Sequence, residues 1–351
     1  MGKQENKMKM KAVRLVEIDK VLAATEIPVP EPSEREVLIK VKAAGICHTD
    51  EHYRAGDIKV PRLPITPGHE VAGIVEKVGN GVSSFKPGDR VCLHYLATCG
   101  VCHYCLSGNE QFCAAGQMIG KDRDGGYAEY IVMPAASLVA LPEEISFEHG
   151  AVMMCSTTTA FHALVKARLK TGERVAVFGC GGLGFSAIQL ALLQGASEVF
   201  AIDIRNEKLR LAAHYGAIPV NAATNDAVAM IREMTRGRGV DVALEMAGLA
   251  LTAGQALRSL GKLGRMVLVG LCDQPFPVKA YSDMLGNEAE IIGCSDHLRS
   301  ELPIVLEFAR QGRIELSGVV ARQIPLQAAE INETLQSLQQ HSGEVRTVIV
   351  P

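Results

Sequence analysis

The sequence has no long apolar run and little net charge, and both absences narrow the possible functions. None of its 351 residues lies in a stretch of ~18 uninterrupted apolar residues, the length of a membrane span. The first residues, MGKQENKMKMKAV, are too polar for a secretory signal peptide. A formal net charge of −3 gives no electrostatic reason to expect nucleic acid or an anionic membrane as a partner. These absences predict a cytoplasmic protein.

Low-complexity segments and internal repeats are also lacking. Charged residues make up 21% and hydrophobic residues 48% of the chain, which is the composition of a globular protein rather than of a disordered one. A chain of 351 residues is long enough for two domains, each with a hydrophobic core of its own.

Two regions of the chain differ in the spacing of their apolar residues. From residue 10 to about 150, short runs such as Val37–Lys42 and Val71–Val75 are separated by Gly and Pro turns, which is typical of a closed or partly closed antiparallel barrel. From about residue 155, strands such as Arg174–Phe178 and Glu198–Ile202 alternate with helices such as Leu183–Leu193. This alternation predicts a doubly wound parallel sheet. The pattern becomes mixed again after about residue 295.

Four cysteines lie close together on one segment: Cys99, Cys102, Cys105 and Cys113. Four thiolates at this spacing can converge on one tetrahedral Zn²⁺, and four protein ligands would leave no open position, so such a zinc would be structural. Metal ligands are favoured over disulfides in a reducing cytosol. The spacing alone leaves a disulfide cluster or an iron–sulfur site open.

A second set of metal-ligating residues is dispersed along the chain: Cys47, His69 and Cys155. A catalytic zinc takes three protein ligands and keeps one position open, and two thiolates with one imidazole supply such a set. An ion held there would lower the pKa of an alcohol that it binds. Taken singly, Cys155 fits a small buried hydrophobe and His69 fits a loop residue, so spacing alone does not decide.

A glycine-rich turn directly follows an apolar strand and opens a helix, with glycines at Gly179, Gly181, Gly182 and Gly184. Such glycines permit a tight turn and close approach of the backbone to a pyrophosphate, and the helix N-terminus offers free N–H groups to the phosphates. Asp203, at the end of the next strand, can accept the ribose hydroxyls of NAD and repel a 2′-phosphate. Asp203 can also cap the following helix, and the nearby Arg205 could tolerate NADP. The pattern favours NAD.

These three motifs occur together and in this order in the zinc-containing alcohol dehydrogenases of the medium-chain dehydrogenase/reductase superfamily, which the sequence resembles. The resemblance rests on Gly68-His69-Glu70-x2-Gly73-x5-Gly79-x2-Val82, the four-cysteine loop and the glycine-rich turn, and extends from about Lys11 to the C-terminus. It implies an α/β protein of two domains. A GroES-like β-barrel catalytic domain would span residues 1–155 and 296–351, and a Rossmann NAD-binding domain would span residues 156–295.

The resemblance also implies the role of each catalytic side chain. Cys47, His69 and Cys155 would hold a catalytic zinc, and the four-cysteine loop a structural one. Asp50 resembles the carboxylate that orients the ligand imidazole, and Glu70 the one that can approach the zinc when substrate is absent. Thr49 resembles the hydroxyl that takes the alcohol proton, and His52 the end of a relay towards solvent. Thr49 and Tyr95 are expected to line the substrate pocket.

Residues for the cofactor follow from the same resemblance. Leu183 and Val269 are expected near the nicotinamide, Lys208 at the adenosine ribose, and His48 and Arg346 at the pyrophosphate. Many relatives have arginine where this chain has His48. A homodimer or homotetramer is expected.

The implied activity is reversible hydride transfer between a primary or secondary alcohol and NAD, which gives an aldehyde or a ketone. Three alternatives stay open from the sequence: a polyol or hydroxy-acid dehydrogenase, a CoA-linked reductase of the same fold, and a non-catalytic NAD-binding scaffold. The number of zinc ions per chain separates the scaffold, with one, from the dehydrogenase, with two.

Overall fold

The computed structural model describes residues 8–340 and 345–351, and the chain divides into two compact units. Unit 1 comprises Met1–Cys155, Leu298–Arg310 and Val320–Pro351, and unit 2 comprises Ser156–His297 and Gln311–Val319. Residues 311–319, expected from the sequence in the catalytic domain, pack with unit 2 instead. There the side-chain amide of Gln189 donates to the Glu315 carbonyl at 2.9 Å and accepts from the Glu315 N–H at 2.7 Å.

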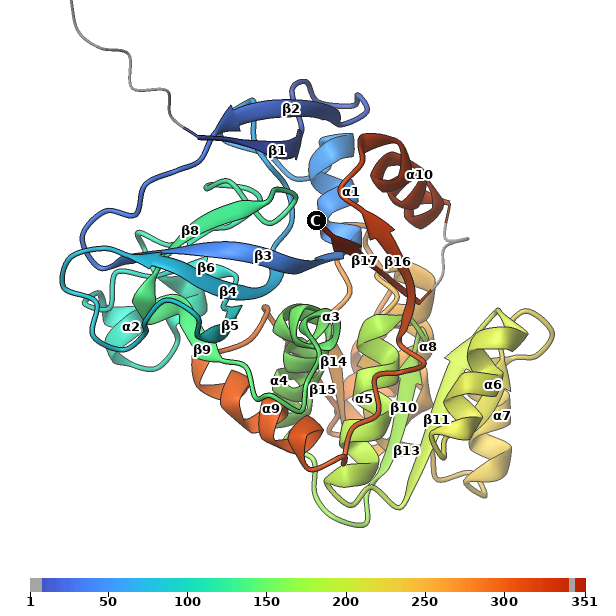
Figure 1. Ribbon diagram of the computed structural model, residues 1–351. Helices are drawn as coiled ribbons and strands as arrows, with labels where there is room; N and C mark the ends of the chain where they lie inside the picture. Colours follow the sequence, from blue (N-terminus) through green and yellow to red (C-terminus); the bar gives the residue numbers. More distant parts are fainter. Residues whose placement is uncertain (1–7, 341–344) are drawn as a thin grey trace, which may run out of the picture. The chain divides into compact units, whose positions relative to one another are not determined.

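Unit 1 is built on a seven-stranded mixed sheet (Figure 1). In sheet order its strands are β16 (Val320–Pro325), β17 (Arg346–Val350), β3 (Glu36–Ile46), β4 (Glu70–Val78), β5 (Arg90–Leu93) and β9 (Leu138–Ala140), and β8 (Tyr130–Pro134) also pairs with β3. Two small sheets accompany it, formed by β1 (Lys9–Arg14) with β2 (Ala23–Pro28) and by β6 (Leu96–Ala97) with β7 (Gln117–Met118). Val37 and Ile39 lie on one face of β3 and join the main core, while Leu38, on the other face, is buried in a second cluster.

Helices and short turns connect the strands of unit 1. They are α1 (His48–Ala55), α2 (His103–Leu106), α3 (Phe147–Val152), α9 (Leu302–Arg310) and α10 (Ala328–Gln339), with short 3₁₀ turns η1 (Glu110–Phe112), η2 (Ala135–Ser137) and η5 (Arg299–Glu301). Helix α1 packs on α10, and α3 packs on β3 and β4. A π-helical turn, η3 (Met153–Thr157), continues α3. Such wide turns are rare and are frequent at functional sites.

Unit 2 contains a six-stranded parallel sheet. In sheet order its strands are β12 (Ile218–Asn221), β11 (Glu198–Asp203), β10 (Arg174–Phe178), β13 (Val240–Glu245), β14 (Leu260–Leu268) and β15 (Glu290–Gly293). The helices are α4 (Thr158–Ala167), α5 (Gly182–Leu193), α6 (Asn206–His214), α7 (Ala227–Met234) and α8 (Ala250–Ser259), with a π-helical segment η4 (Ala280–Leu285). The strand order reverses between β10 and β13, the switch point at which such sheets bind ligands.

The predicted α/β fold class is confirmed, and the predicted strand Arg174–Phe178 coincides with β10. The helix expected over Leu183–Leu193 is α5, which begins one residue earlier. Within the described residues, no helix combines the length and the apolar character needed to cross a membrane.

Candidate metal centres and cofactor loop

Two strand ends and one helical turn bring the dispersed cysteines and histidine together. Cys47 follows β3 and is the N-cap of α1, while His69 directly precedes β4. These strands pair with Gly45 opposite Glu70, so the end of β3 and the start of β4 are neighbours. Cys155 reaches the same place from the π-helical turn after α3, which packs on both strands.

The resulting cluster consists of Cys47, His69, Glu70 and Cys155, whose potential ligand atoms all lie within 4.8 Å of one another. All four residues are buried. Two sulfurs, one imidazole nitrogen and a carboxylate thus surround one point in the interior of unit 1. The three residues predicted as a ligand set from sequence are the sulfur and nitrogen donors of this cluster.

The ionisation of the cluster is strongly coupled. Hydrogen bonding from the Cys155 thiol and the charges of His69 and Arg346 lower the pKa of Cys47 well below its usual value. Burial lowers the pKa of His69, but the Asp50 carboxylate and Cys47 outweigh it and raise this pKa well above normal. A thiolate therefore forms first at Cys47, as ligation of a metal requires.

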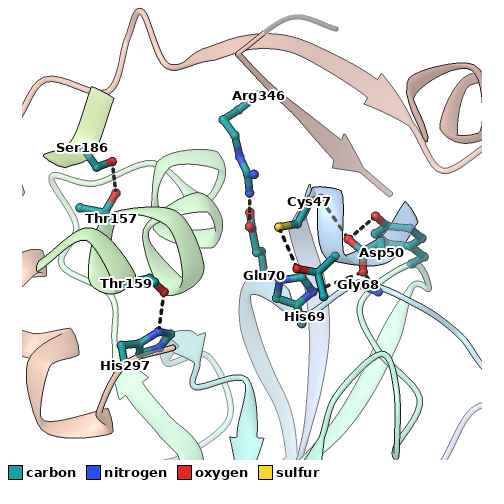
Figure 2. A network of polar contacts seen from close by, with 12 residues as sticks. Cys47, Asp50, Gly68, His69, Glu70, Thr157, Thr159, Ser186, His297 and Arg346 are labelled. Carbon is teal, nitrogen blue, oxygen red and sulfur yellow. Dashed lines mark hydrogen bonds and ion pairs between the residues drawn. The ribbon is translucent and has the colours of Figure 1, made fainter. Parts of the chain in front are cut away.

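Asp50 is the centre of a buried hydrogen-bond network that holds two members of the cluster. Its Oδ2 accepts from the Cys47 N–H at 3.0 Å, and its Oδ1 accepts from the Gly68 N–H at 3.2 Å (Figure 2). His69 Nδ1 lies 3.3 Å from Oδ1. A carboxylate can only accept, so Nδ1 carries a proton, and Nε2 is the nitrogen that would bind a metal in place of its own proton. Asp50 therefore contacts both the His69 ring and the backbone of Cys47.

One further residue in this network, Tyr127, was not foreseen from the sequence. Its side chain is fully buried, and its hydroxyl donates to Asp50 Oδ2 at 2.9 Å. Burial and the Asp50 carboxylate raise the pKa of Tyr127 well above its usual value, so the phenol stays a neutral donor. The two residues are 77 positions apart in the sequence, and no local pattern around Tyr127 predicts their contact.

Glu70 and Arg346 form a buried ion pair beside the cluster (Figure 2). The register explains their meeting, since Glu70 lies opposite Gly45 and Thr347 lies opposite Ile46 on the two sides of β3. Burial raises the pKa of Glu70 to about 7, against the opposing effect of Arg346. Glu70 Oε2 is buried without a hydrogen-bond partner in the described part of the chain. Arg346, which the resemblance assigned to a pyrophosphate, has its guanidinium on Glu70 here.

The residues expected to handle a proton lie on α1. The Thr49 hydroxyl is 3.7 Å from Cys47 Sγ, at the edge of the cluster. His52 stacks on His48 with ring centroids 4.9 Å apart, and its Nδ1 is 2.9 Å from Asp57 Oδ2. The predicted pocket residue Tyr95 is buried and meets His94 edge-on at 4.6 Å.

The four-cysteine loop forms the second cluster of possible metal ligands, made by Cys99, Cys102, Cys105 and Cys113. Four of its sulfur–sulfur distances are 3.5, 3.6, 3.9 and 3.9 Å. A tetrahedron with Zn–S bonds of ~2.3 Å has edges of about 3.8 Å, so the sulfurs are spaced for one ion. None of the four is in a disulfide, and their spacing matches a shared ion rather than an S–S bond of ~2.05 Å. An iron–sulfur cluster that spreads its cysteines over several irons fits these short distances poorly.

The glycine-rich turn links β10 to α5 in unit 2. Gly179 has φ +98, a conformation that favours glycine, and a Cβ at Gly184 would lie 2.0 Å from the Gly179 carbonyl oxygen. A Cβ at Gly181, the N-cap of α5, would meet no atom within 4 Å. The close approach of Gly184 to Gly179 permits tight packing of α5 against β10. The open space at Gly181 leaves the N–H groups of α5 accessible to an anion.

Asp203 ends β11 beside this turn, as predicted. Its Oδ2 accepts from the Cys180 N–H at 2.8 Å and its Oδ1 from the Arg205 N–H at 3.0 Å. The Arg205 side chain forms an ion pair with Glu207. Lys208 lies on α6, close enough for its charge to act on Cys180.

The predicted cofactor residues divide between the two units. Gly182 and Leu183 begin α5, and Val269 follows β14, where its N–H donates to the Glu245 carbonyl at 3.0 Å. These residues belong to unit 2, as do the glycines, Asp203 and Lys208, whereas His48 and Arg346 belong to unit 1.

Two family models match the chain. An alcohol dehydrogenase GroES-like domain matches residues 33–143, and a zinc-binding dehydrogenase domain matches residues 182–311. The first match lies within unit 1. The second lies mainly within unit 2.

Curated relatives and solved structures match almost the whole chain. An alcohol dehydrogenase of Geobacillus stearothermophilus is 40% identical over 309 residues, 87% of this chain and 90% of the relative. An NAD-dependent alcohol dehydrogenase of Sulfurisphaera tokodaii is 34% identical over 97% of this chain and 100% of its own length. A zinc-binding dehydrogenase of Sinorhizobium meliloti, solved with NADP, has a TM-score of 0.89 and 30% identity, covering 98% of this chain and all of its own.

Proposed function

This chain belongs to the zinc-containing alcohol dehydrogenases of the medium-chain dehydrogenase/reductase superfamily, and we propose that it uses NAD to oxidise small primary or secondary alcohols. It is an oxidoreductase that acts on CH–OH donors, by reversible hydride transfer that gives an aldehyde or a ketone. We propose three things in particular: that the cofactor is NAD, that the alcohol is small, and that individual residues act as described below.

The convergence of Cys47, His69 and Cys155 on one buried point carries this proposal. These donors are separate from the four cysteines that surround the other point, so the chain offers two metal sites of different kinds. Three protein ligands leave a coordination position for substrate, and four do not. A scaffold without catalysis would need only the closed site.

The chemistry of the cluster fits Zn²⁺. Thiolate and imidazole are the donors that zinc prefers, and the buried Oε2 of Glu70 without a hydrogen bond would be stabilised by a nearby cation. Cys47, His69 and Cys155 would hold the ion, with Glu70 close by. When bound there, zinc supplies a Lewis acid that polarises the substrate oxygen.

The proton would be handled by residues of α1, and the substrate would be limited by a residue between β5 and β6. Thr49, beside Cys47, would accept the proton that leaves the alcohol hydroxyl. His52 would take that proton onward, since its partially exposed ring and its partner Asp57 connect it to solvent. Tyr95 would limit the size of the substrate with its buried ring.

The cofactor proposal rests on the turn between β10 and α5. The N–H groups of α5 would bind the pyrophosphate, and His48 is a second proposed pyrophosphate residue. Leu183 and Val269 would pack near the nicotinamide and Lys208 near the adenosine ribose. Asp203 would accept the ribose hydroxyls. NAD is favoured over NADP because the guanidinium of Arg205, a cation two residues beyond Asp203, is paired with Glu207.

Replacing Asp203 with Ser should reduce kcat/KM for NAD by about 10- to 100-fold while leaving that for NADP unchanged or higher. Hydrogen bonds to a charged group contribute about 1.5–3 kcal/mol, and 1.4 kcal/mol corresponds to a factor of ten. The measurement is the ratio of the two kcat/KM values.

The matched control for this change is Asp241→Ser. The Asp241 carboxylate also accepts a backbone N–H, that of Arg174 at 2.8 Å, but at the opposite ends of the strands. Its loss should lower stability and leave the NAD/NADP ratio unchanged. An unchanged ratio in Asp203→Ser would contradict the assignment of this carboxylate.

The proposed function is tested by NADH formation when purified protein and NAD meet a panel of short primary, secondary and polyhydric alcohols. Turnover that a zinc chelator abolishes supports the proposal, and the ranking of the alcohols defines the pocket. No turnover with two zinc ions per chain would indicate a larger or CoA-linked substrate. No turnover with one zinc would indicate the scaffold.

We also propose that the protein is cytoplasmic and acts as a homodimer or homotetramer. All cysteines described in the structure are free, which suits a reducing compartment. Size-exclusion chromatography with light scattering measures the oligomeric state.

A further inference from the structure

Tyr127 lies against the turn that carries His69. The segment before it runs beside that turn, where the Gly126 N–H donates to the Gly68 carbonyl at 2.8 Å and the Tyr127 N–H to the Pro67 carbonyl at 3.0 Å. Gly68 has φ +98, and a Cβ there would lie 2.4 Å from Cδ1 of the Tyr127 ring. The ring therefore contacts the Gly68 backbone directly, and the hydroxyl points beyond it to Asp50.

The hydroxyl of Tyr127 makes the shortest of the four contacts to the Asp50 carboxylate. Its distance is 2.9 Å, against 3.0 Å for the Cys47 N–H, 3.2 Å for the Gly68 N–H and 3.3 Å for His69 Nδ1. Asp50 is 1% exposed, so water does not replace a lost donor at low cost. With the tyrosine present, two donors hold each oxygen, and the carboxylate has one orientation.

We propose that Tyr127 is a positioning residue for the catalytic metal centre: its buried hydroxyl fixes the Asp50 carboxylate, which in turn orients His69 and the backbone of Cys47. This inference rests on the proposed zinc site. The partners of a ligand imidazole set its tautomer and direction, and losing one typically reduces metal affinity 10- to 100-fold. Tyr127 contacts Asp50 and not the imidazole, so it is one contact further from the metal. Its loss should therefore reduce metal affinity by about tenfold, the lower end of that range.

The test is Tyr127→Phe, which keeps the ring against Gly68 and removes only the hydroxyl. In the presence of EDTA the variant should lose its catalytic zinc roughly tenfold faster than the wild type. After replacement of that zinc by Co²⁺, the visible absorption bands should change in position or intensity, because they report the ligand geometry. A general loss of stability would not move these bands.

Tyr53→Phe is the matched control. Tyr53 is a buried tyrosine of the same unit whose hydroxyl donates to the Met118 sulfur at 3.1 Å. Its variant should lose zinc at the wild-type rate with unchanged Co²⁺ bands.

The outcomes separate this inference from the proposed function. Wild-type protein with two zinc ions and a Tyr127→Phe variant with unaltered zinc loss and Co²⁺ bands would overturn the inference alone. A variant that also lost the four-cysteine zinc would show a general folding role for the hydroxyl and would overturn it too. Wild-type protein with a single zinc would remove the proposed function itself.

Discussion

Replacing Cys155 with Ala should reduce kcat/KM for alcohol oxidation by about 10³-fold or more and lower the zinc content from two ions per chain to one. The change removes one of the three proposed ligands, and a Lewis acid contributes several kcal/mol to the reaction, with each 1.36 kcal/mol corresponding to a factor of ten. Zinc analysis and steady-state kinetics on the same preparation measure both effects.

Cys92→Ala provides the control for the loss of a buried thiol. Cys92 is fully buried in β5 of the same unit, where burial raises the pKa of its thiol, and it belongs to neither cluster. This variant should keep two zinc ions and most of its activity. Wild-type activity in Cys155→Ala would exclude Cys155 as a ligand and would require a different reading of the cluster.

The second large effect is expected at the four-cysteine loop, where Cys105→Ser should destabilise the protein. None of residues 99–113 is buried, so this segment has no apolar core of its own. A bound metal would hold the segment together instead. Losing one ligand should cost at least about 3 kcal/mol, which lowers the melting temperature of a chain of this length by about 4 °C or more.

Limited proteolysis provides the readout specific to that loop, with new cleavage sites expected within residues 99–113. The control is Cys272→Ser, which changes an exposed cysteine outside both clusters and should leave the melting temperature and the cleavage pattern unaltered. If Cys105→Ser melted like the wild type and resisted the protease, the loop would not depend on a metal.

Sequence motifs predicted the components that depend on local spacing. The turn at Gly179–Gly184 is predictable because its glycines permit the tight backbone of that same segment. The four cysteines are predictable because they lie close together in the sequence. The set of Cys47, His69 and Cys155 needed the family resemblance, since nothing local joins Cys155 to the other two. The structure brings all three together where β3, β4 and the π-helical turn meet.

Contacts between segments far apart in the sequence could not be predicted in the same way. Tyr127 reaches Asp50 only because the chain passes close to Gly68, and Arg346 reaches Glu70 only because β17 and β4 flank β3. Residues 311–319 pack with unit 2, where the side chain of Gln189 forms hydrogen bonds with the backbone of Glu315, 126 residues later in the sequence. Such pairings are set by sheet register and packing, which apolar periodicity does not specify.

The close spacing of the four sulfurs has a consequence for handling the protein in air. Cys99 is exposed, and backbone hydrogen bonds from Cys105 and Ala114 lower the pKa of Cys102 to about 6, so a metal-free loop would carry a reactive thiolate at neutral pH. Its neighbours are 3.6 and 3.9 Å away, and a disulfide needs about 2.05 Å, so a small movement suffices for oxidative cross-linking. A metal in this loop therefore acts as a protecting group, and after its removal in air the loop would not bind metal again until a reductant opened the disulfide.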